Sequence, residues 1–179
     1  MKVAYYGGSF DPVHEAHFLI IKNLSENFDK VVLQVSHNWT KPASVFSLTN
    51  RERALSLLVK DLKNVEVLLN KPEDDNSSTY VVVKKIESYL GIKPVIVIGS
   101  DNVSNIEKWK KWEELKKYNW RIYIRSTPVE SFKAQYETVD LKIPNISSTE
   151  IRKNINKTQV PEKIRDVYEW DKLNNMIKK

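Results

Sequence analysis

The chain has 179 residues, of which 41% are hydrophobic, and it carries a formal net charge of +6 at pH 7. It contains no cysteine, which excludes disulfide bridges and thiolate metal sites. No apolar run reaches the roughly 20 residues that a membrane-spanning helix needs. We therefore expect one globular domain over residues 1–179, located in the cytoplasm.

The positive charge does not by itself indicate a nucleic-acid partner. Lysines alternate with acidic residues, as in residues 107–114, which read EKWKKWEE. This mixture is typical of a solvated helix face, whereas a polynucleotide track needs basic residues clustered on one face. We therefore expect neither a nucleic acid nor a membrane as partner. The alternative to a merely solvated surface is that the positive charge creates an electrostatic field that attracts small anions.

Strand-like apolar runs alternate with helix-like segments along the chain. The predicted strands are Val3–Tyr6, Val31–Val35, Val65–Leu69, Val95–Ile98, Arg121–Ile124 and Val139–Ile143. The predicted helices are Glu15–Asn27, Asn50–Asp61, Tyr80–Leu90, Val103–Lys117, Ser148–Ile155 and Pro161–Asn174. Continuous Val/Ile runs separated by helices predict an α/β fold, a Rossmann-like doubly wound domain whose parallel sheet has helices on both faces.

The polar segments that could carry chemistry follow the predicted strands rather than precede them. They are residues 7–17, 36–41, 99–101 and 144–149. In an open parallel sheet, ligands bind in the crevice beyond the carboxyl ends of the strands. The sequence therefore predicts that these segments converge on one rim of the sheet.

The first of these segments, GGSFDPVHEAH, has the features of a phosphate site. Gly7 and Gly8 end a strand and would let a ligand approach the backbone closely. His14 and His17 are three residues apart, so both can lie on one face of a helix's first turn, where N–H groups are free. For the Asp11-Pro12 step, a purely structural role in capping and initiating that helix is the alternative.

The segment ISSTEIR at residues 146–152 also has a structural alternative. Ser147 and Glu150 have the spacing of a capping box, which by itself would satisfy a helix start. Arg152, however, lies four residues after Ser148 and shares its helical face. Hydroxyls, free N–H groups and a guanidinium together would form a cradle for phosphates.

Two interpretations are open for the segment after the central predicted strand. Asp101 is either the N-cap of a turn or a carboxylate that accepts hydrogen bonds from ribose hydroxyls, with Gly99 leaving room for the sugar. Trp109 is one of three closely spaced tryptophans, with Trp112 and Trp120. We expect at least one of them in the core, while a large flat face also suits stacking on an electron-poor ring.

Together these segments resemble the motifs of a known enzyme superfamily. Residues 7–17 resemble the first signature of the nucleotidyltransferases, which usually ends in His-x-Gly-His, and residues 146–152 resemble the second. Within that superfamily, residues 98–102 (IGSDN), Trp109 and the chain length most resemble the bacterial nicotinate-nucleotide adenylyltransferases. One departure is Ala16, which stands where the superfamily has glycine.

The resemblance implies adenylyl transfer from ATP to nicotinate mononucleotide, or to its nicotinamide form, with release of pyrophosphate. Mg²⁺ would bind together with ATP, without a metal site built from protein side chains. Small-molecule substrates are the expected partners, and assembly into a homo-oligomer is an open alternative. The implied catalytic residues are His14, His17 and Arg152. The implied ATP-binding residues are Gly7, Gly8, Ser9, Phe10, Lys41, Gly99, Asp101, Ser147, Ser148 and Thr149. The implied pyridine-nucleotide contacts are Thr79, Tyr80 and Trp109.

The attacking phosphate is already largely ionised at neutral pH, so the histidines are expected to stabilise charge at the α-phosphate rather than to act as bases. Lys41 and Arg51 match basic positions of relatives, with a plain surface cation as the alternative for each. Two other functions stay open: a pantetheine-phosphate adenylyltransferase, which shares both signatures, and a non-catalytic nucleotide-binding sensor.

Overall fold

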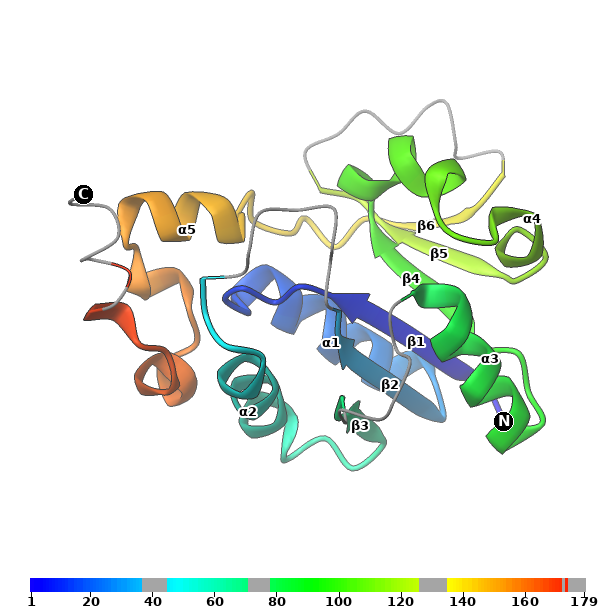
Figure 1. The fold of residues 1–179 in the computed structure, drawn as a ribbon, viewed down its shortest axis with the longest axis horizontal. Coiled ribbons are helices and arrows are strands. Elements are labelled where there is room, and N and C mark those ends of the chain that lie inside the picture. The colour runs from blue at the N-terminus through cyan, green and yellow to red at the C-terminus, as the bar shows by residue number, and fades with distance from the viewer. Residues whose placement is uncertain (37–44, 71–77, 126–134, 172, 174–179) are drawn as a thin grey trace.

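A computed structural model gives the fold and describes residues 1–36, 45–70, 78–125, 135–171 and 173. Within them, six strands form one sheet in which all neighbours are parallel, in the order β3-β2-β1-β4-β5-β6 (Figure 1). The strands are β1 (Val3–Gly8), β2 (Lys30–Val35), β3 (Val65–Leu68), β4 (Val95–Gly99), β5 (Trp120–Tyr123) and β6 (Glu137–Val139). The predicted parallel α/β sheet is confirmed.

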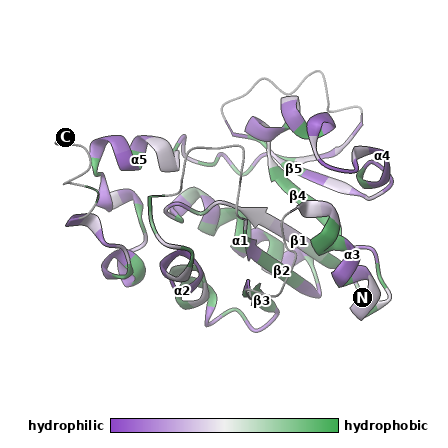
Figure 2. Ribbon diagram, viewed as in Figure 1, coloured by the Kyte–Doolittle hydropathy of each residue, from purple (hydrophilic) through white to green (hydrophobic). Residues whose placement is uncertain are grey.

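The helices cover both faces of this sheet, as predicted. They are α1 (Glu15–Asn27), α2 (Leu48–Val59), α3 (Thr79–Leu90), α4 (Trp112–Leu115) and α5 (Ser148–Asn154), with 3₁₀ segments η1 (Ser100–Lys108), η2 (Lys157–Gln159) and η3 (Glu162–Val167). One hydrophobic cluster joins α1, α2, α5 and η3 to the sheet, and the other joins α3, η1 and α4 to its opposite face. In Figure 2, β4 is coloured as hydrophobic, whereas α5 is coloured largely as hydrophilic.

Side chains alternate between the two faces along each strand, because successive strand residues point in opposite directions. In β1, Ala4 and Tyr6 join the first cluster, whereas Val3 and Tyr5 join the second. The strands are therefore buried on both sides, which explains their continuous apolar runs.

Two predicted helices are wrong in form. The segment over 103–117 is divided into η1 and α4, and Lys111 just before α4 has a φ of 62° that a continuous α-helix excludes. The segment over 161–174 starts as η3, and Tyr168 then returns to extended backbone. The last strand is also shifted, since β6 ends at Val139, where the prediction begins.

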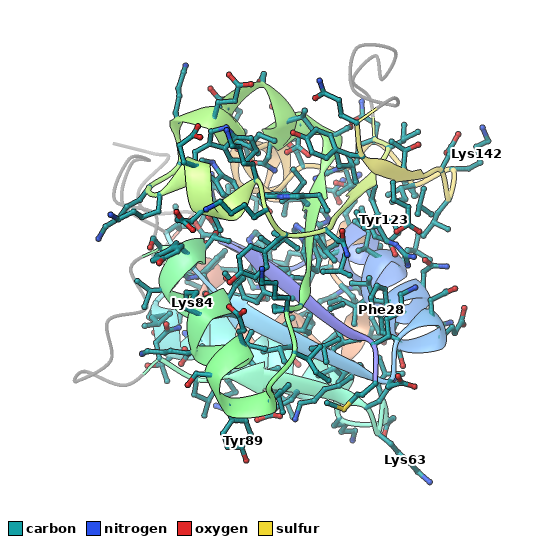
Figure 3. The ribbon with its side chains drawn as sticks, turned by 90° about the vertical axis from the view of Figure 1, so that its right-hand side faces the viewer. Phe28, Lys63, Lys84, Tyr89, Tyr123 and Lys142 are labelled. Carbon is teal, nitrogen blue, oxygen red and sulfur yellow. The ribbon has the colours of Figure 1, made fainter. Side chains whose placement is uncertain are left out.

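The lysine-rich surface has the solvated character that the sequence predicts. Lys63, Tyr89 and Lys142 extend outward from the molecule in Figure 3, whereas Phe28 and Tyr123 lie within it. Several lysines pair with an acid three residues away on the same helix, such as Lys84 with Glu87. Among the described residues, no helix is both long and apolar enough to cross a bilayer.

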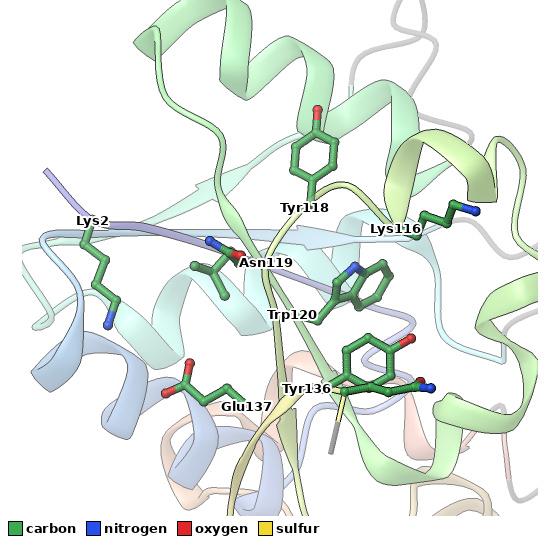
Figure 4. Close-up of a pocket in the computed structure, with 9 residues that line it drawn as sticks. Lys2, Lys116, Tyr118, Asn119, Trp120, Tyr136 and Glu137 are labelled. Atoms are coloured by element: carbon green, nitrogen blue, oxygen red, sulfur yellow. The ribbon is translucent and has the colours of Figure 1, made fainter. Parts of the chain in front are cut away.

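A cavity of about 310 Å³ lies at the amino ends of β4 and β5 (Figure 4). It is lined by Trp120, Tyr136 and Glu137, with Val95 and Trp120 marking where those two strands begin. This cavity therefore lies at the edge of the sheet opposite the rim at which ligands are expected.

Candidate active site

Two of the predicted polar segments, residues 7–17 and 99–101, lie at the carboxyl ends of central strands. The chain leaves β1 at Gly8 toward α1, and it leaves β4 at Gly99 directly into η1. β1 pairs with β2 on one side and β4 on the other, so the strand order reverses between β1 and β4, the position at which such sheets bind ligands. The α5 end of the molecule lies on this side, away from the N-terminus (Figure 1).

His14 and His17 form a stacked pair at the start of α1. Their ring centroids are 3.7 Å apart with an angle of 24° between the planes. The backbone N–H of His14, the N-cap residue, donates to Nδ1 of His17 over 3.3 Å, which fixes the second ring. His14 is buried, and its Nδ1 has no hydrogen-bond partner among the described residues. Such an unsatisfied buried nitrogen is costly and is ready to bind a ligand atom.

Both imidazoles are neutral at pH 7 in the ligand-free protein. Burial, and then the positive charge of Arg125, lower the pKa of His14 to about 3. Burial, His14 and Arg125 likewise lower the pKa of His17 well below its ordinary value of 6.5. The pair therefore offers neutral N–H donors rather than two fixed positive charges.

Arg125 is a functional candidate that the sequence analysis did not identify. It lies just beyond the carboxyl end of β5, and its side chain is only 13% exposed. Its guanidinium donates to the Ile146 carbonyl and lies 3.7 Å from the Asp101 carboxylate (Nη1 to Oδ1). The rule that site residues follow strands could have found it, because Arg125 follows a predicted strand.

Asp11 connects three segments of the rim. Its carboxylate accepts hydrogen bonds from the backbone N–H groups of Val45 (3.1 Å) and Phe46 (3.0 Å). The same carboxylate lies 3.5 Å from the guanidinium of Arg152, which also donates to the Asp11 carbonyl. The alternative that Asp11 caps α1 is wrong, because the N-cap residue of that helix is His14.

The second motif is held directly against the first. The Ser148 hydroxyl donates to the Pro12 carbonyl over 2.9 Å, so α5 starts beside the loop that precedes the histidines. Ser147 is the N-cap of α5 and accepts from the Glu150 N–H at 3.1 Å. The Glu150 carboxylate instead pairs with Lys153, so the reciprocal half of a capping box is replaced by an ion pair. Thr149 lies 3.4 Å from Arg152 (Oγ1 to Nη2).

At Gly7, Gly8 and Gly99, the space that a Cβ atom would occupy is taken by a nearby side chain of the same chain. A Cβ at Gly7 would lie 2.5 Å from the Tyr5 hydroxyl, and one at Gly99 would lie 2.4 Å from the Asp101 carboxylate. Gly8 faces the ring of Phe10, which is buried against Tyr6 and His17. The Phe10 ring is thus a core group, and only its backbone remains for a nucleotide contact.

The basic residues near the second strand differ in their placement. Lys41 lies outside the described residues. Arg51 is 1% exposed, and its guanidinium donates to the carbonyls of Ser9 (2.7 Å) and Phe46 (3.0 Å). The surface-cation alternative is therefore wrong for Arg51, which supports the backbone of the first motif from beneath.

The predicted pyridine-nucleotide residues lie on the α3 face of the sheet. Thr79 begins α3, and Tyr80 and Trp109 pack, partly buried, against the second hydrophobic cluster. Trp120 is 4% exposed and lies 5.9 Å from Trp109, ring centroid to centroid. The expected core tryptophan is thus Trp120, and Trp109 keeps a partly exposed face.

Asp101 belongs to η1, whose N-cap is Gly99, so the N-cap interpretation of Asp101 is wrong.

Known proteins resemble this chain over most of its length. A family model described as cytidylyltransferase-like matches residues 5–154. The chain belongs to the cytidylyltransferase-like family. It is 32% identical over 180 residues to a probable nicotinate-nucleotide adenylyltransferase of Aliarcobacter butzleri, covering 96% of this chain and 98% of that protein. A phosphopantetheine adenylyltransferase of Clostridium tetani is 48% identical over 67 residues, covering 37% of this chain and 41% of that protein.

The fold of this cytidylyltransferase-like chain also matches a solved structure. That structure is nicotinic acid mononucleotide adenylyltransferase of Plasmodium falciparum complexed with NaAD, with a TM-score of 0.75 and 20% identity. The match covers 93% of each chain. The Rossmann-like class predicted from the strand and helix pattern is confirmed.

Ala16 is the residue at which this member departs from the usual first signature. Its side chain is 1% exposed and belongs to the hydrophobic cluster beneath α1. The extra methyl group therefore packs in the core with residues such as Ile20.

Resident metal binding has no support in the part of the chain that the structure describes. These residues contain no group of three or more His, Asp or Glu side chains placed to hold an ion. Mg²⁺ commonly keeps several waters and binds through substrate phosphates rather than in an all-protein cage.

Proposed function

We propose that this protein transfers the adenylyl group of ATP to nicotinate mononucleotide and releases pyrophosphate. The observation that carries this proposal is the tie between the two motifs: Ser148 and Arg152 hold the Pro12 and Asp11 backbone beside the stacked histidines. The near-full-length similarity to the Aliarcobacter butzleri relative supports the same reaction. The one six-stranded sheet formed by the described residues supports one functional unit for the chain.

The reaction forms a bond between the mononucleotide's phosphate oxygen and the α-phosphorus of ATP. The bond from the α-phosphorus to the bridging oxygen of the β-phosphate breaks, and pyrophosphate leaves with the electron pair. The nucleophile is already largely ionised at neutral pH, because a phosphomonoester has a second pKa of about 6. The protein's task is therefore to align the two substrates and to neutralise the charge at the α-phosphate.

His17 donates to the α-phosphate oxygen in this proposal, while His14 and Arg152 bind the triphosphate. Neutral imidazoles suit this role, because each donates an N–H and gains a proton if the phosphates raise its pKa. Arg125 adds a cation on the β5 side of the crevice, with Asp101 available to the ribose hydroxyls. Mg²⁺ would arrive bound to ATP and neutralise its phosphates.

The pyridine half is assigned to the start of α3 and to Trp109. Thr79 and Tyr80 contribute to the first turn of α3, where backbone N–H groups suit a carboxylate. The partly exposed face of Trp109 suits stacking on the pyridine ring.

A pyrophosphate-release assay tests the proposal. The protein is given MgATP with nicotinate mononucleotide, nicotinamide mononucleotide or phosphopantetheine, and the adenylylated product is identified by mass. We expect the highest kcat/KM with nicotinate mononucleotide. Preference for phosphopantetheine, which the local similarity to the Clostridium tetani enzyme makes the second candidate, would overturn the assignment. ATP binding without turnover of any acceptor would indicate a sensor.

A further inference from the structure

The loop between β1 and α1, residues 9–13, is held by side chains from distant parts of the chain. Three of these side chains bind backbone carbonyls of the loop, namely Arg51, Ser148 and Arg152. A fourth contact comes from Tyr168, which follows η3 and belongs to neither of the two motifs. Its hydroxyl oxygen accepts a hydrogen bond from the Val13 N–H over 3.1 Å, although the two residues are 155 positions apart. The segment that follows η3 therefore contacts the first motif directly.

The backbone of this loop has an unfavourable conformation at one residue. Phe10 has a φ of 46°, in the left-handed region that a bulky side chain rarely occupies. Such a conformation persists only where the surrounding structure holds it, and it is typical of functional sites. The contacts to the loop therefore maintain a shape that the chain by itself would not favour.

The ring and the hydroxyl of Tyr168 have separate partners. The ring lies 4.8 Å from that of Phe46 and 5.9 Å from that of Trp170, centroid to centroid, in the first hydrophobic cluster. A phenylalanine ring would pack there equally well. The hydroxyl instead contacts Val13, which is 0% exposed, so water does not reach that N–H as an alternative acceptor. The hydroxyl thus has a role apart from the packing of the ring.

The peptide group between Pro12 and Val13 is bound at both of its polar atoms. Its carbonyl accepts from the Ser148 hydroxyl over 2.9 Å, and its N–H donates to the Tyr168 hydroxyl over 3.1 Å. The C=O and the N–H of a planar peptide group point in opposite directions, so two such bonds fix the plane of the group. Ser148 and Tyr168 therefore act on the same peptide from opposite sides.

The next peptide group carries the N–H that orients His17. This N–H belongs to His14 and donates to Nδ1 of His17 over 3.3 Å. Burial keeps the pKa of His17 well below its ordinary value, so the ring is neutral at pH 7. A neutral imidazole has one N–H and one acceptor nitrogen, so accepting at Nδ1 places the His17 proton on Nε2. The backbone between Val13 and His14 thereby determines which nitrogen of His17 can donate to a phosphate.

We propose that Tyr168 is a positioning residue whose hydroxyl fixes the Pro12–Val13 peptide and thereby keeps the His17 proton on Nε2, ready to be donated in a hydrogen bond to the α-phosphate. This inference rests on the proposed function, because it takes His17 as the donor to the α-phosphate. Tyr168 touches neither substrate in this proposal. Because the His17 bond strengthens as charge develops in the transition state, the effect of Tyr168 is expected in kcat rather than in either KM.

Tyr168→Phe tests the proposal, because it removes the hydroxyl and keeps the ring. The matched control is Tyr118→Phe, which also removes a hydrogen-bonded hydroxyl (to Glu87, 2.7 Å) but lies near the amino ends of the strands. We expect Tyr168→Phe to lower kcat by about three- to tenfold, the range of one hydrogen bond, with the KM for ATP and for nicotinate mononucleotide unchanged. We expect Tyr118→Phe to change none of the three. An unchanged kcat in Tyr168→Phe would overturn the proposal.

A double-mutant cycle separates positioning of His17 from a general disturbance of the site. If Tyr168 acts through His17, then Tyr168→Phe lowers kcat no further in a His17→Ala background. An equal fall in kcat with and without His17 would overturn the proposal, because Tyr168 would then act on another group.

Heteronuclear NMR of the imidazoles distinguishes the two neutral tautomers of His17 and keeps the test independent of activity. We expect the Nε2–H form in the wild type and in Tyr118→Phe, and a larger share of the Nδ1–H form in Tyr168→Phe. If the wild-type protein forms no dinucleotide, the proposed function fails, and this measurement still decides whether Tyr168 sets the tautomer. An unchanged tautomer of His17 in Tyr168→Phe would overturn the inference, whatever the reaction is.

Two properties of the wild type keep the inference falsifiable if Tyr168→Phe does not fold. The buried Val13 amide should exchange its hydrogen slowly, because its N–H is bonded to Tyr168. His17 should carry its proton on Nε2, because Nδ1 accepts from the His14 N–H. Fast exchange at Val13, or a proton on Nδ1 of His17, would overturn the proposal.

Discussion

The hydroxyl of Ser148 donates a hydrogen bond to the carbonyl of Pro12 over 2.9 Å, although the two residues are 136 positions apart. This bond sets the start of α5 against the loop that leads to His14 and His17. Arg152, one turn later in α5, adds the bond to the Asp11 carbonyl. The two halves of the candidate ATP site are therefore joined by the protein itself before any ligand binds, which is a form of preorganisation.

Ser148→Ala tests this tie. The variant leaves the Pro12 carbonyl without its donor, and we expect a loss of about 1 kcal/mol of stability together with a several-fold rise in the KM for ATP. The control is Ser47→Ala, which removes the N-cap bond to the Asn50 N–H in α2 and should cost similar stability without changing the KM. Thermal unfolding and pyrophosphate release measure the two effects. Equal KM changes in both variants would contradict the tie.

His17→Ala tests the assignment of charge stabilisation at the α-phosphate. Removing one preorganised donor to developing charge is expected to lower kcat by about two to three orders of magnitude. The fold is expected to persist, because His17 is only partly buried and lies at the start of α1. The circular dichroism spectrum checks the fold. A fully active His17→Ala enzyme would exclude this role.

Stability should depend on pH through His14. Its pKa is about 3 in the folded protein against 6.5 ordinarily, so between these values the unfolded chain binds more protons. Stability is therefore fully present above pH 6.5 and falls as the pH drops toward 3, by up to about 1.4 kcal/mol per pH unit. His17 contributes in the same direction.

Urea unfolding of the wild type and of His14→Asn at pH 7, 6 and 5 measures this dependence. The asparagine variant lacks the titrating group, so its stability should fall less steeply with acid. Parallel curves for the two proteins would show that His14 titrates normally in the folded state.

Arg125→Met should change both the histidines and ATP binding. Because the Arg125 charge lowers the pKa values of His14 and His17, its removal should raise both, which NMR titration of the imidazoles can follow. We expect kcat/KM for ATP to fall at least about tenfold, the effect of losing one charge-assisted contact. Arg121→Met, which removes the pairing with Glu137, is the control and should leave the imidazole pKa values unchanged.

Gly99→Ala tests the space that Asp101 and Arg125 share. The new Cβ would lie 2.4 Å from Asp101 Oδ1 and 3.2 Å from Arg125 Cδ, so the pair must move. We expect a cost of roughly 1–3 kcal/mol in stability and a fall in kcat/KM for ATP of about tenfold. Gly91→Ala is the matched control, since Gly91 has open space around it and only a left-handed φ of 69°. It should lose about 1 kcal/mol of stability and keep its kinetics.

Local patterns in the sequence determined the fold class and most of the candidate site. The continuous runs of Val and Ile identified the central strands, and the spacing of His14 and His17 placed them together at the start of α1. The serine cap at Ser147 was likewise visible as a local signal. These features depend on residues a few positions apart, and the period of a helix or strand fixes such neighbours.

Only the tertiary structure decided how distant groups meet. Sheet order and helix packing bring Arg125 near the histidines and Asp11 to Arg152, and no local pattern encodes either approach. The same holds for Tyr168, which looks like an ordinary core residue until its hydroxyl is seen beside the Val13 N–H. The protonation state of the histidines also required the structure, because it depends on burial and on a cation more than 100 residues away.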